Sequence, residues 1–152
     1  AEVGQACEWI HQISPETICF VDNCYGEFVE VQEPTMVGAD LIAGSLIKNP
    51  GGGLAPTGGY ICGRADLVES AANALTAPGL GNAMGSCNTD QRLYFQGLFQ
   101  APHVVSQAIQ SGIFAAALFS QLGFAVDPLP DESRSDIIQS ISLGNPEQDI
   151  AF

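Results

Sequence analysis

The fold is decided by the stretch Leu41-Ile42-Ala43-Gly44-Ser45-Leu46-Ile47-Lys48-Asn49-Pro50-Gly51-Gly52-Gly53. Its first part, residues 41–47, is a short apolar run that predicts a buried strand. Its second part places a lysine directly before a proline and three glycines, which predict a loop. This residue, Lys48, is the only lysine in the chain. A lone lysine between a buried strand and a glycine-rich loop is not part of an ordinary solvated surface.

A second strand is predicted just upstream, at residues 17–21, where the sequence reads Thr-Ile-Cys-Phe-Val. It ends in the polar turn Asp22-Asn23-Cys24-Tyr25-Gly26. Open α/β sheets bind ligands at the edge where their parallel strands end. Asp22 and Lys48 both follow predicted strands, so we consider them together as a candidate site.

The remaining pattern alternates helices and strands and predicts the α/β class. Amphipathic helices are expected at residues 2–13 and 64–75, and the longest helix at 102–122, with Pro102 in its first turn and Gly123 as its C-terminal cap. Further strands are expected at residues 58–63, 124–126 and 137–143. Residues 76–89 are rich in Gly, Pro and Asn and predict a long loop. A last helix is expected to begin near Asn145.

Composition limits the kind of protein. The chain has 152 residues, 46% of them hydrophobic, which suits one domain with a real core. A net charge of −13 argues against binding to nucleic acid or to an anionic membrane. The longest apolar run, residues 113–119, is too short to span a membrane. No signal peptide is evident at the start, and the five cysteines predict free thiols, no metal site and a cytoplasmic location.

The chemistry open to Lys48 depends on its surroundings. A lysine desolvated beside a buried strand has a lowered pKa, and its neutral amine can attack a carbonyl. A carboxylate at Asp22 could pair with a protonated pyridine nitrogen. The alternatives are a lysine that reaches out to solvent and an aspartate that only forms a turn.

Taken together, the chain resembles fold-type-I enzymes that depend on pyridoxal 5'-phosphate (PLP). Within them it is most similar to the aluminium-resistance or methionine gamma-lyase-like branch, which is related to the cystathionine lyases. The resemblance is carried by residues 18–26 and 38–53 and is extended by residues 54–60, 96–99 and 101–105. It implies that the chain is part of the large PLP-binding domain, a mixed, mostly parallel sheet flanked by helices.

The resemblance also implies roles for individual residues. Lys48 would form the internal aldimine with PLP and act as acid and base, and Asp22 would pair with the pyridine nitrogen. Ser45 would contact the cofactor phosphate, or else only satisfy backbone at a strand end. Tyr25 would hold the phenolic oxygen of the cofactor, or else be a plain aromatic near the pocket. Cystathionine lyases have threonine before the lysine and tyrosine after it, where this chain has Ile47 and Asn49, which puts the phosphate contacts in doubt.

The implied function is a carbon–sulfur lyase acting on sulfur-containing amino acids, with a homo-oligomeric parent enzyme. Two alternatives stay open: a different PLP reaction, such as transamination or decarboxylation, and a non-catalytic acidic interaction module. Both ends of the sequence open or stop inside helical patterns. We therefore expect residues 1–152 to be a central fragment, truncated at both ends and inactive alone, without the N-terminal phosphate-binding segment and the C-terminal small domain.

Overall fold

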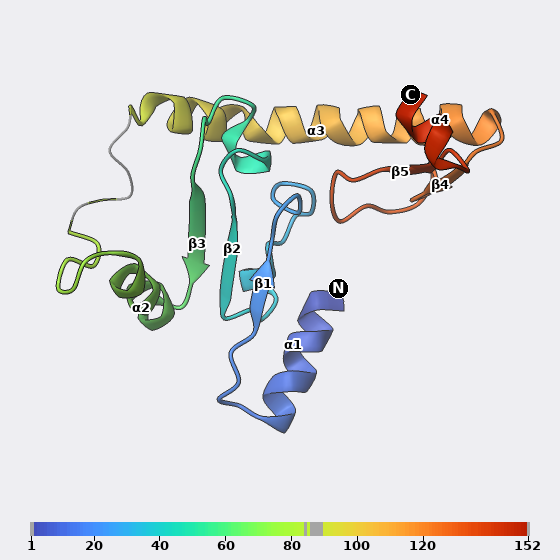
Figure 1. Cartoon of the computed structure of the whole chain (residues 1–152). Helices are drawn as coiled ribbons and strands as arrows, with labels where there is room; N and C mark the ends of the chain where they lie inside the picture. The colour runs from blue at the N-terminus through green and yellow to red at the C-terminus, as the bar shows by residue number, and fades with distance from the viewer. Residues whose placement is uncertain (1, 84, 86–89, 152) are drawn as a thin grey trace.

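Three strands lie side by side at the centre of the computed structural model, which describes residues 2–83, 85 and 90–151 (Figure 1). They are β1 (Phe20–Asp22), β2 (Leu41–Ser45) and β3 (Gly59–Gly63), in the order β1-β2-β3. β1 runs parallel to β2, with Val21 opposite Ile42, and β3 runs antiparallel to β2, with Cys62 opposite Ile42. All three predicted strands are present, although each is shorter than expected.

The expected sheet type is confirmed only in part. The central sheet is mixed, but among the described strands only the β1–β2 pairing is parallel. The mixed sheet is therefore confirmed, whereas the mostly parallel sheet expected of the larger domain stays a prediction. The antiparallel pairing arises between β2 and β3, where the chain forms only the short 3-10 helix η2 (Asn49–Gly51) and turns back. A parallel return needs a longer crossover, usually through an α-helix.

Helix α1 (Glu2–Ile13) has the predicted bounds and lies beside β1. It contributes Cys7 to a small buried core with Cys19, Ala39 and Ile42. The 3-10 helix η1 (Pro34–Met36) lies in the connection between β1 and β2. Helix α2 (Ala65–Leu75), which was predicted at residues 64–75, follows β3 and packs against it. The predicted loop at residues 76–89 has no helix or strand where it is described, and residues 84 and 86–89 lie outside the described part.

The long helix α3 (Arg92–Gln121) runs across the edge at which β1 and β2 end, and it packs against η2 (Figure 1). It begins at Arg92, so Pro102 lies inside the helix and its expected place in the first turn is wrong. Proline removes one backbone hydrogen bond there. Ala101 and Val105, on either side of it, are almost fully buried. Packing along the whole helix therefore outweighs the local preference. Gly123 has a φ of 89° just past the end of the helix, as predicted for a cap.

The C-terminal part forms a small unit under the far end of α3 (Figure 1). β4 (Ala125–Asp127) and β5 (Ser140–Ser142) pair antiparallel, and α4 (Pro146–Ala151) follows. Both strands were predicted in these regions. Among the helices that the structure describes, none combines the length and the apolar character needed to cross a membrane.

Candidate functional site

The candidate site lies at the edge of the sheet where β1 and β2 both end. Because the two strands are parallel and in register from Phe20 opposite Leu41 to Asp22 opposite Ala43, their carboxyl ends meet on the same side. Asp22 is the last residue of β1, and Lys48 lies three positions after Ser45, the last residue of β2, and directly before η2. The two side chains are close enough for each charge to act on the other. The sequence-predicted pair is thus brought together.

Cys24 lies between the two charged groups. Its side chain hydrogen-bonds with the Asp22 carboxylate and with the Lys48 amine. Its backbone N–H also donates to Asp22 Oδ1 at 3.1 Å. These hydrogen bonds from Cys24, and more weakly the charge of Lys48, hold the pKa of Asp22 below its ordinary value. Asp22 is therefore ionised at neutral pH.

The Lys48 amine has an aromatic ring and a cysteine side chain as neighbours. Its Nζ lies 4.3 Å from the centroid of the Tyr25 ring, a cation–π contact. The pKa of Lys48 is raised, chiefly by its hydrogen bond with Cys24, with electrostatic contributions from Cys24, Tyr25 and Asp22. Burial opposes this but is outweighed, because the side chain is only half-buried. The expectation of a lowered pKa is wrong for this structure, since it counted burial alone.

The other two predicted site residues lie on either side of the lysine. Ser45 ends β2 opposite Gly59, and its carbonyl oxygen accepts a hydrogen bond from the Lys48 N–H at 3.3 Å. Tyr25 follows β1 and supplies the ring beneath the amine. Both are thus neighbours of Lys48. Contacts of Ser45 with a phosphate and of Tyr25 with a phenolic oxygen stay predictions.

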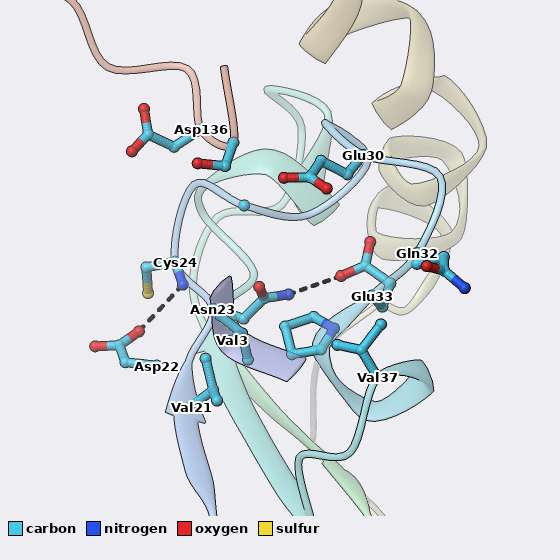
Figure 2. A pocket seen from close by; sticks show the side chains of 13 residues that line it. Val3, Val21, Asp22, Asn23, Cys24, Glu30, Gln32, Glu33, Val37 and Asp136 are labelled. Carbon is cyan, nitrogen blue, oxygen red and sulfur yellow. Dashed lines mark hydrogen bonds between the residues drawn. The ribbon is translucent and has the colours of Figure 1, made fainter. Parts of the chain in front are cut away.

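Two cavities flank this edge of the sheet. Figure 2 shows one of about 250 Å³, whose lining includes the carboxylates of Asp22, Glu30, Glu33 and Asp136. The other, about 330 Å³, has mainly apolar walls and lies toward α3; its lining residues are Tyr25, Ile47, Lys48, Asn49, Val104, Val105, Ala108 and Ile137. The amine and the ionised carboxylate fit the aldehyde and the ring nitrogen of PLP. The acidic cavity does not fit its phosphate, because like charges repel.

Sequence reasoning missed two members of this site, Cys24 and Asn49. Asn49 is buried, with 5% of its surface exposed, and its Nδ2 donates to the carbonyl oxygens of Tyr25 at 2.9 Å and Glu27 at 3.0 Å. The available signal was adjacency, since Cys24 follows Asp22 by two positions and Asn49 follows Lys48 directly. The partners of Asn49 lie more than twenty positions away in the sequence, as Lys48 does from Cys24, so adjacency alone could not show these contacts.

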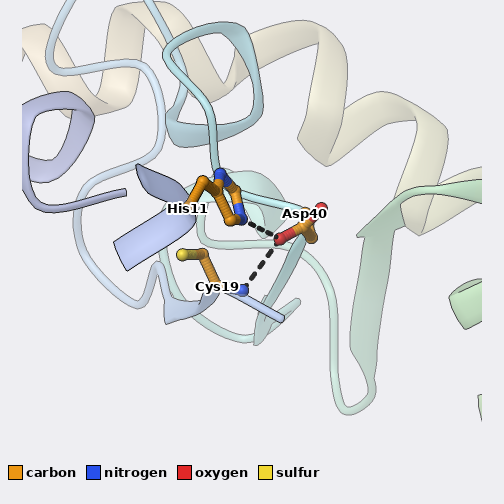
Figure 3. Close-up of side chains that lie close together, drawn as sticks. All are labelled: His11, Cys19 and Asp40. Atoms are coloured by element: carbon orange, nitrogen blue, oxygen red, sulfur yellow. Dashed lines mark hydrogen bonds and ion pairs between the residues drawn. The ribbon is translucent and has the colours of Figure 1, made fainter. Parts of the chain in front are cut away.

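A second cluster lies at the opposite end of the same strands (Figure 3). His11, Cys19 and Asp40 place one donor atom each within 4.8 Å of one another, a spacing that could hold a metal ion. Both Asp40 oxygens are already used, however. Oδ2 accepts from His11 Nε2 at 2.9 Å and from the Cys19 N–H at 2.8 Å, and Oδ1 accepts from Arg64 at 3.2 Å. This cluster is an anchor joining α1, β1, β2 and the start of α2, and it gives His11 a role that the sequence did not suggest.

Comparison with known proteins gives consistent matches along the chain. The pattern of the methionine gamma-lyase family matches residues 1–152. The chain is 47% identical to the protein YnbB of Bacillus subtilis over 152 residues, which are all of this chain and 36% of YnbB. It is 48% identical over 151 residues to a 33.9 kDa protein of Lactobacillus delbrueckii subsp. bulgaricus, covering 99% of this chain and 49% of that protein.

Solved structures agree with this. One from Listeria monocytogenes, named as a candidate cystathionine beta-lyase involved in aluminium resistance, is 52% identical with a TM-score of 0.92; the match covers 95% of this chain and 36% of that one. A carbon–sulfur lyase involved in aluminium resistance from Clostridium novyi is 49% identical with a TM-score of 0.91; the match covers 95% of this chain and 35% of that one. The chain thus spans between about a third and a half of these relatives. The resemblance seen in the sequence is confirmed, and the chain belongs to the methionine gamma-lyase family.

Proposed function

We propose that this chain is the cofactor-binding part of a PLP-dependent carbon–sulfur lyase of fold type I, acting on sulfur-containing amino acids. The observation that carries the proposal is the meeting of Lys48 and Asp22 at one sheet edge, from two strands that lie apart in the sequence. The names of the solved relatives, a candidate cystathionine beta-lyase and a carbon–sulfur lyase, support the reaction class.

PLP, when bound, supplies an aldehyde that condenses with amines and a pyridine ring that accepts electrons. Lys48, the only lysine of this chain, would hold PLP through Nζ. Asp22 would face the ring nitrogen. Because its pKa is lowered, Asp22 carries the negative charge that keeps such a nitrogen protonated.

Lys48 would also move a proton. In its neutral form, Nζ can accept a proton from the α-carbon of the amino acid and return it to the product. The raised pKa means that the amine must first lose its own proton, and the contacts with Cys24 and Tyr25 resist this loss. Tyr25 and the apolar wall of the neighbouring cavity would limit the access of water to this atom.

The proposal is tested by labelling. The natural full-length protein is incubated with PLP, reduced with borohydride and digested, and the modified peptide is mapped by mass spectrometry. We expect the label on Lys48 and its loss in Lys48→Arg, which keeps the positive charge but cannot condense with an aldehyde. Label at another residue, or no label, would overturn the proposal. Release of thiol from cystathionine or methionine by the same preparation then tests the reaction class.

A further inference from the structure

The turn that carries Tyr25 has an unusual backbone. Tyr25 has a φ of 73° and Phe28 a φ of 64°, both in the left-handed region that glycine favours. Each such residue costs roughly 1–2 kcal/mol and persists only where neighbouring contacts hold it. The turn therefore has to be fixed by something outside itself.

Asn49 supplies contacts of this kind. Its buried side-chain amide donates hydrogen bonds to the backbone carbonyls of Tyr25 and Glu27. These two bonds hold the strained turn from a different segment of the chain. Among the residues that the structure describes, no other side chain donates a hydrogen bond to both of these carbonyls. Since Asn49 follows Lys48 directly in the chain, the same short segment carries the amine and holds the ring beneath it.

The backbone around Asn49 is itself fixed. Gly51 and Gly52 pack against Gly97 of α3 so closely that a β-carbon at Gly97 would collide with the Gly51 carbonyl. Glycine at these positions lets the two backbones pass closely. The far side of the turn is fixed as well, because Tyr60 of β3 donates its hydroxyl to Glu27 Oε1 at 2.7 Å. Asn49 therefore links the η2 segment, which packs on α3, to the turn that Tyr60 holds through Glu27.

We propose that Asn49 is a positioning residue for the Lys48 amine, acting through the turn that carries Tyr25 and Cys24. The positioning of the amine by Asn49 does not depend on the proposed function; only the role of the amine in binding PLP does. Asn49 stands where cystathionine lyases have tyrosine, so the departure seen in the sequence marks a different way of supporting the lysine. The Asn49 side chain bonds neither the Lys48 amine nor the Asp22 carboxylate. It acts through its two hydrogen bonds to the carbonyls of Tyr25 and Glu27.

The test measures the lysine itself, without PLP. The full-length protein is freed of bound carbonyl compounds by dialysis against hydroxylamine, treated with formaldehyde and cyanoborohydride over a range of pH, and Lys48 dimethylation is followed by mass spectrometry. Only the neutral amine reacts. We expect Asn49→Ala to raise the rate roughly threefold at a pH below the lysine pKa, and to move the pH profile toward lower pH, because the cation–π contact is lost. Asn49→Leu keeps the size, removes the donor and adds no charge, and should behave alike.

A double-mutant cycle separates positioning from general loosening. In a Tyr25→Leu background the effect of Asn49→Ala should shrink markedly, since the ring that Asn49 positions is gone. Tyr25→Phe keeps the ring, so in that background the effect of Asn49→Ala should persist. Asn73→Ala, at an exposed asparagine of α2, should leave the Lys48 profile unchanged. An unchanged Lys48 profile in both Asn49 variants, an equal effect in the Tyr25→Leu background, or failure of both variants to fold would overturn the proposal in favour of a purely structural asparagine. Because no PLP is used, the result is independent of whether PLP labels Lys48.

Discussion

The two ends of the central strands use charged side chains in opposite ways. At the amino end, Asp40 accepts three hydrogen bonds from three other parts of the chain, and its carboxylate is 13% exposed. At the carboxyl end, Lys48 makes none of the ion pairs found among residues 2–83, 85 and 90–151, and rests on an aromatic ring and a thiol. The first arrangement holds elements together. The second leaves a charge whose state a ligand can still change.

The same chemical change at the two ends should separate these roles, and the larger effect is expected at Asp22. In Asp22→Asn the side chain keeps its shape but loses the charge that would face the ring nitrogen. We expect lyase activity of the full-length protein to fall on the order of 10²- to 10³-fold, as when one electrostatic partner of a reaction centre is removed. The measurement is kcat with PLP at saturation.

Thermal unfolding provides the control for this variant. Asp22 is exposed to solvent on one side, and its chief partner is a residue two positions away. The midpoint of unfolding should therefore change little. A large drop in that midpoint, with activity lost only in proportion to unfolded protein, would show that both ends of the strands serve stability.

Asp40→Asn should show the opposite pattern. The variant loses the charge that draws His11 and Arg64 to the carboxylate. We expect the free energy of unfolding at neutral pH to fall by about 2 kcal/mol, less than for a fully buried pair because His11 and Arg64 are partly exposed. Chemical denaturation measures this. Label incorporation at Lys48 in the folded protein should be unchanged.

Acid provides an internal check on that result. Hydrogen bonds from the Cys19 N–H, then from Arg64 and His11, lower the pKa of Asp40 in the folded state. A lowered pKa stabilises the fold above the unfolded value, about 4, and this contribution is lost as the pH falls through the folded value. The difference between wild type and Asp40→Asn should therefore disappear in acid. A difference that persists at low pH would mean that the anchor works by shape and not by charge.

Between the two ends, the contact of α3 with η2 offers a third way to test the comparison. Gly97→Ala would place a methyl group against the Gly51 carbonyl, so backbone must move. We expect a loss of about 1–2 kcal/mol in the free energy of unfolding, typical of overpacking, and slower PLP labelling of Lys48.

Gly112→Ala, in the same helix, is the matched control. Its new methyl group would come closest to the end of the Arg134 side chain, at 3.3 Å, which can move aside, and would make ordinary contact with Gln139 Cβ at 3.9 Å. That variant should be neutral or slightly stabilising, because alanine favours helix over glycine. Equal losses of unfolding free energy in both variants would show that α3 tolerates no added volume at either position. The contact with η2 would then not be the cause of the loss in Gly97→Ala.

How far the sequence predicted this structure depended on whether a pattern was local. The stripe of α1 and the apolar runs of β1 and β2 are local patterns, and they placed Asp22 and Lys48 at one edge correctly. Pro102 is the opposite case, since its place inside α3 follows from burial of Ala101 and Val105 by distant segments. The direction of the Lys48 pKa was missed for the same reason, because it depends on Cys24 and Tyr25, which reach the amine only in the folded chain.

The smallest expected effect concerns how easily Lys48 takes up an aldehyde. Its hydrogen bond with Cys24 is the largest cause of its raised pKa, so the neutral amine is scarce at neutral pH. Cys24→Ala removes that bond, and the rate of PLP labelling at neutral pH should rise a few-fold, since each pKa unit changes the neutral fraction roughly tenfold. Cys24→Ser keeps a hydrogen-bonding group and should fall between. Slower labelling in Cys24→Ala would mean that the thiol mainly positions the amine and does not mainly hold its proton. The side chains at the carboxyl end of the strands would then serve to fix structure, as those around Asp40 do at the amino end.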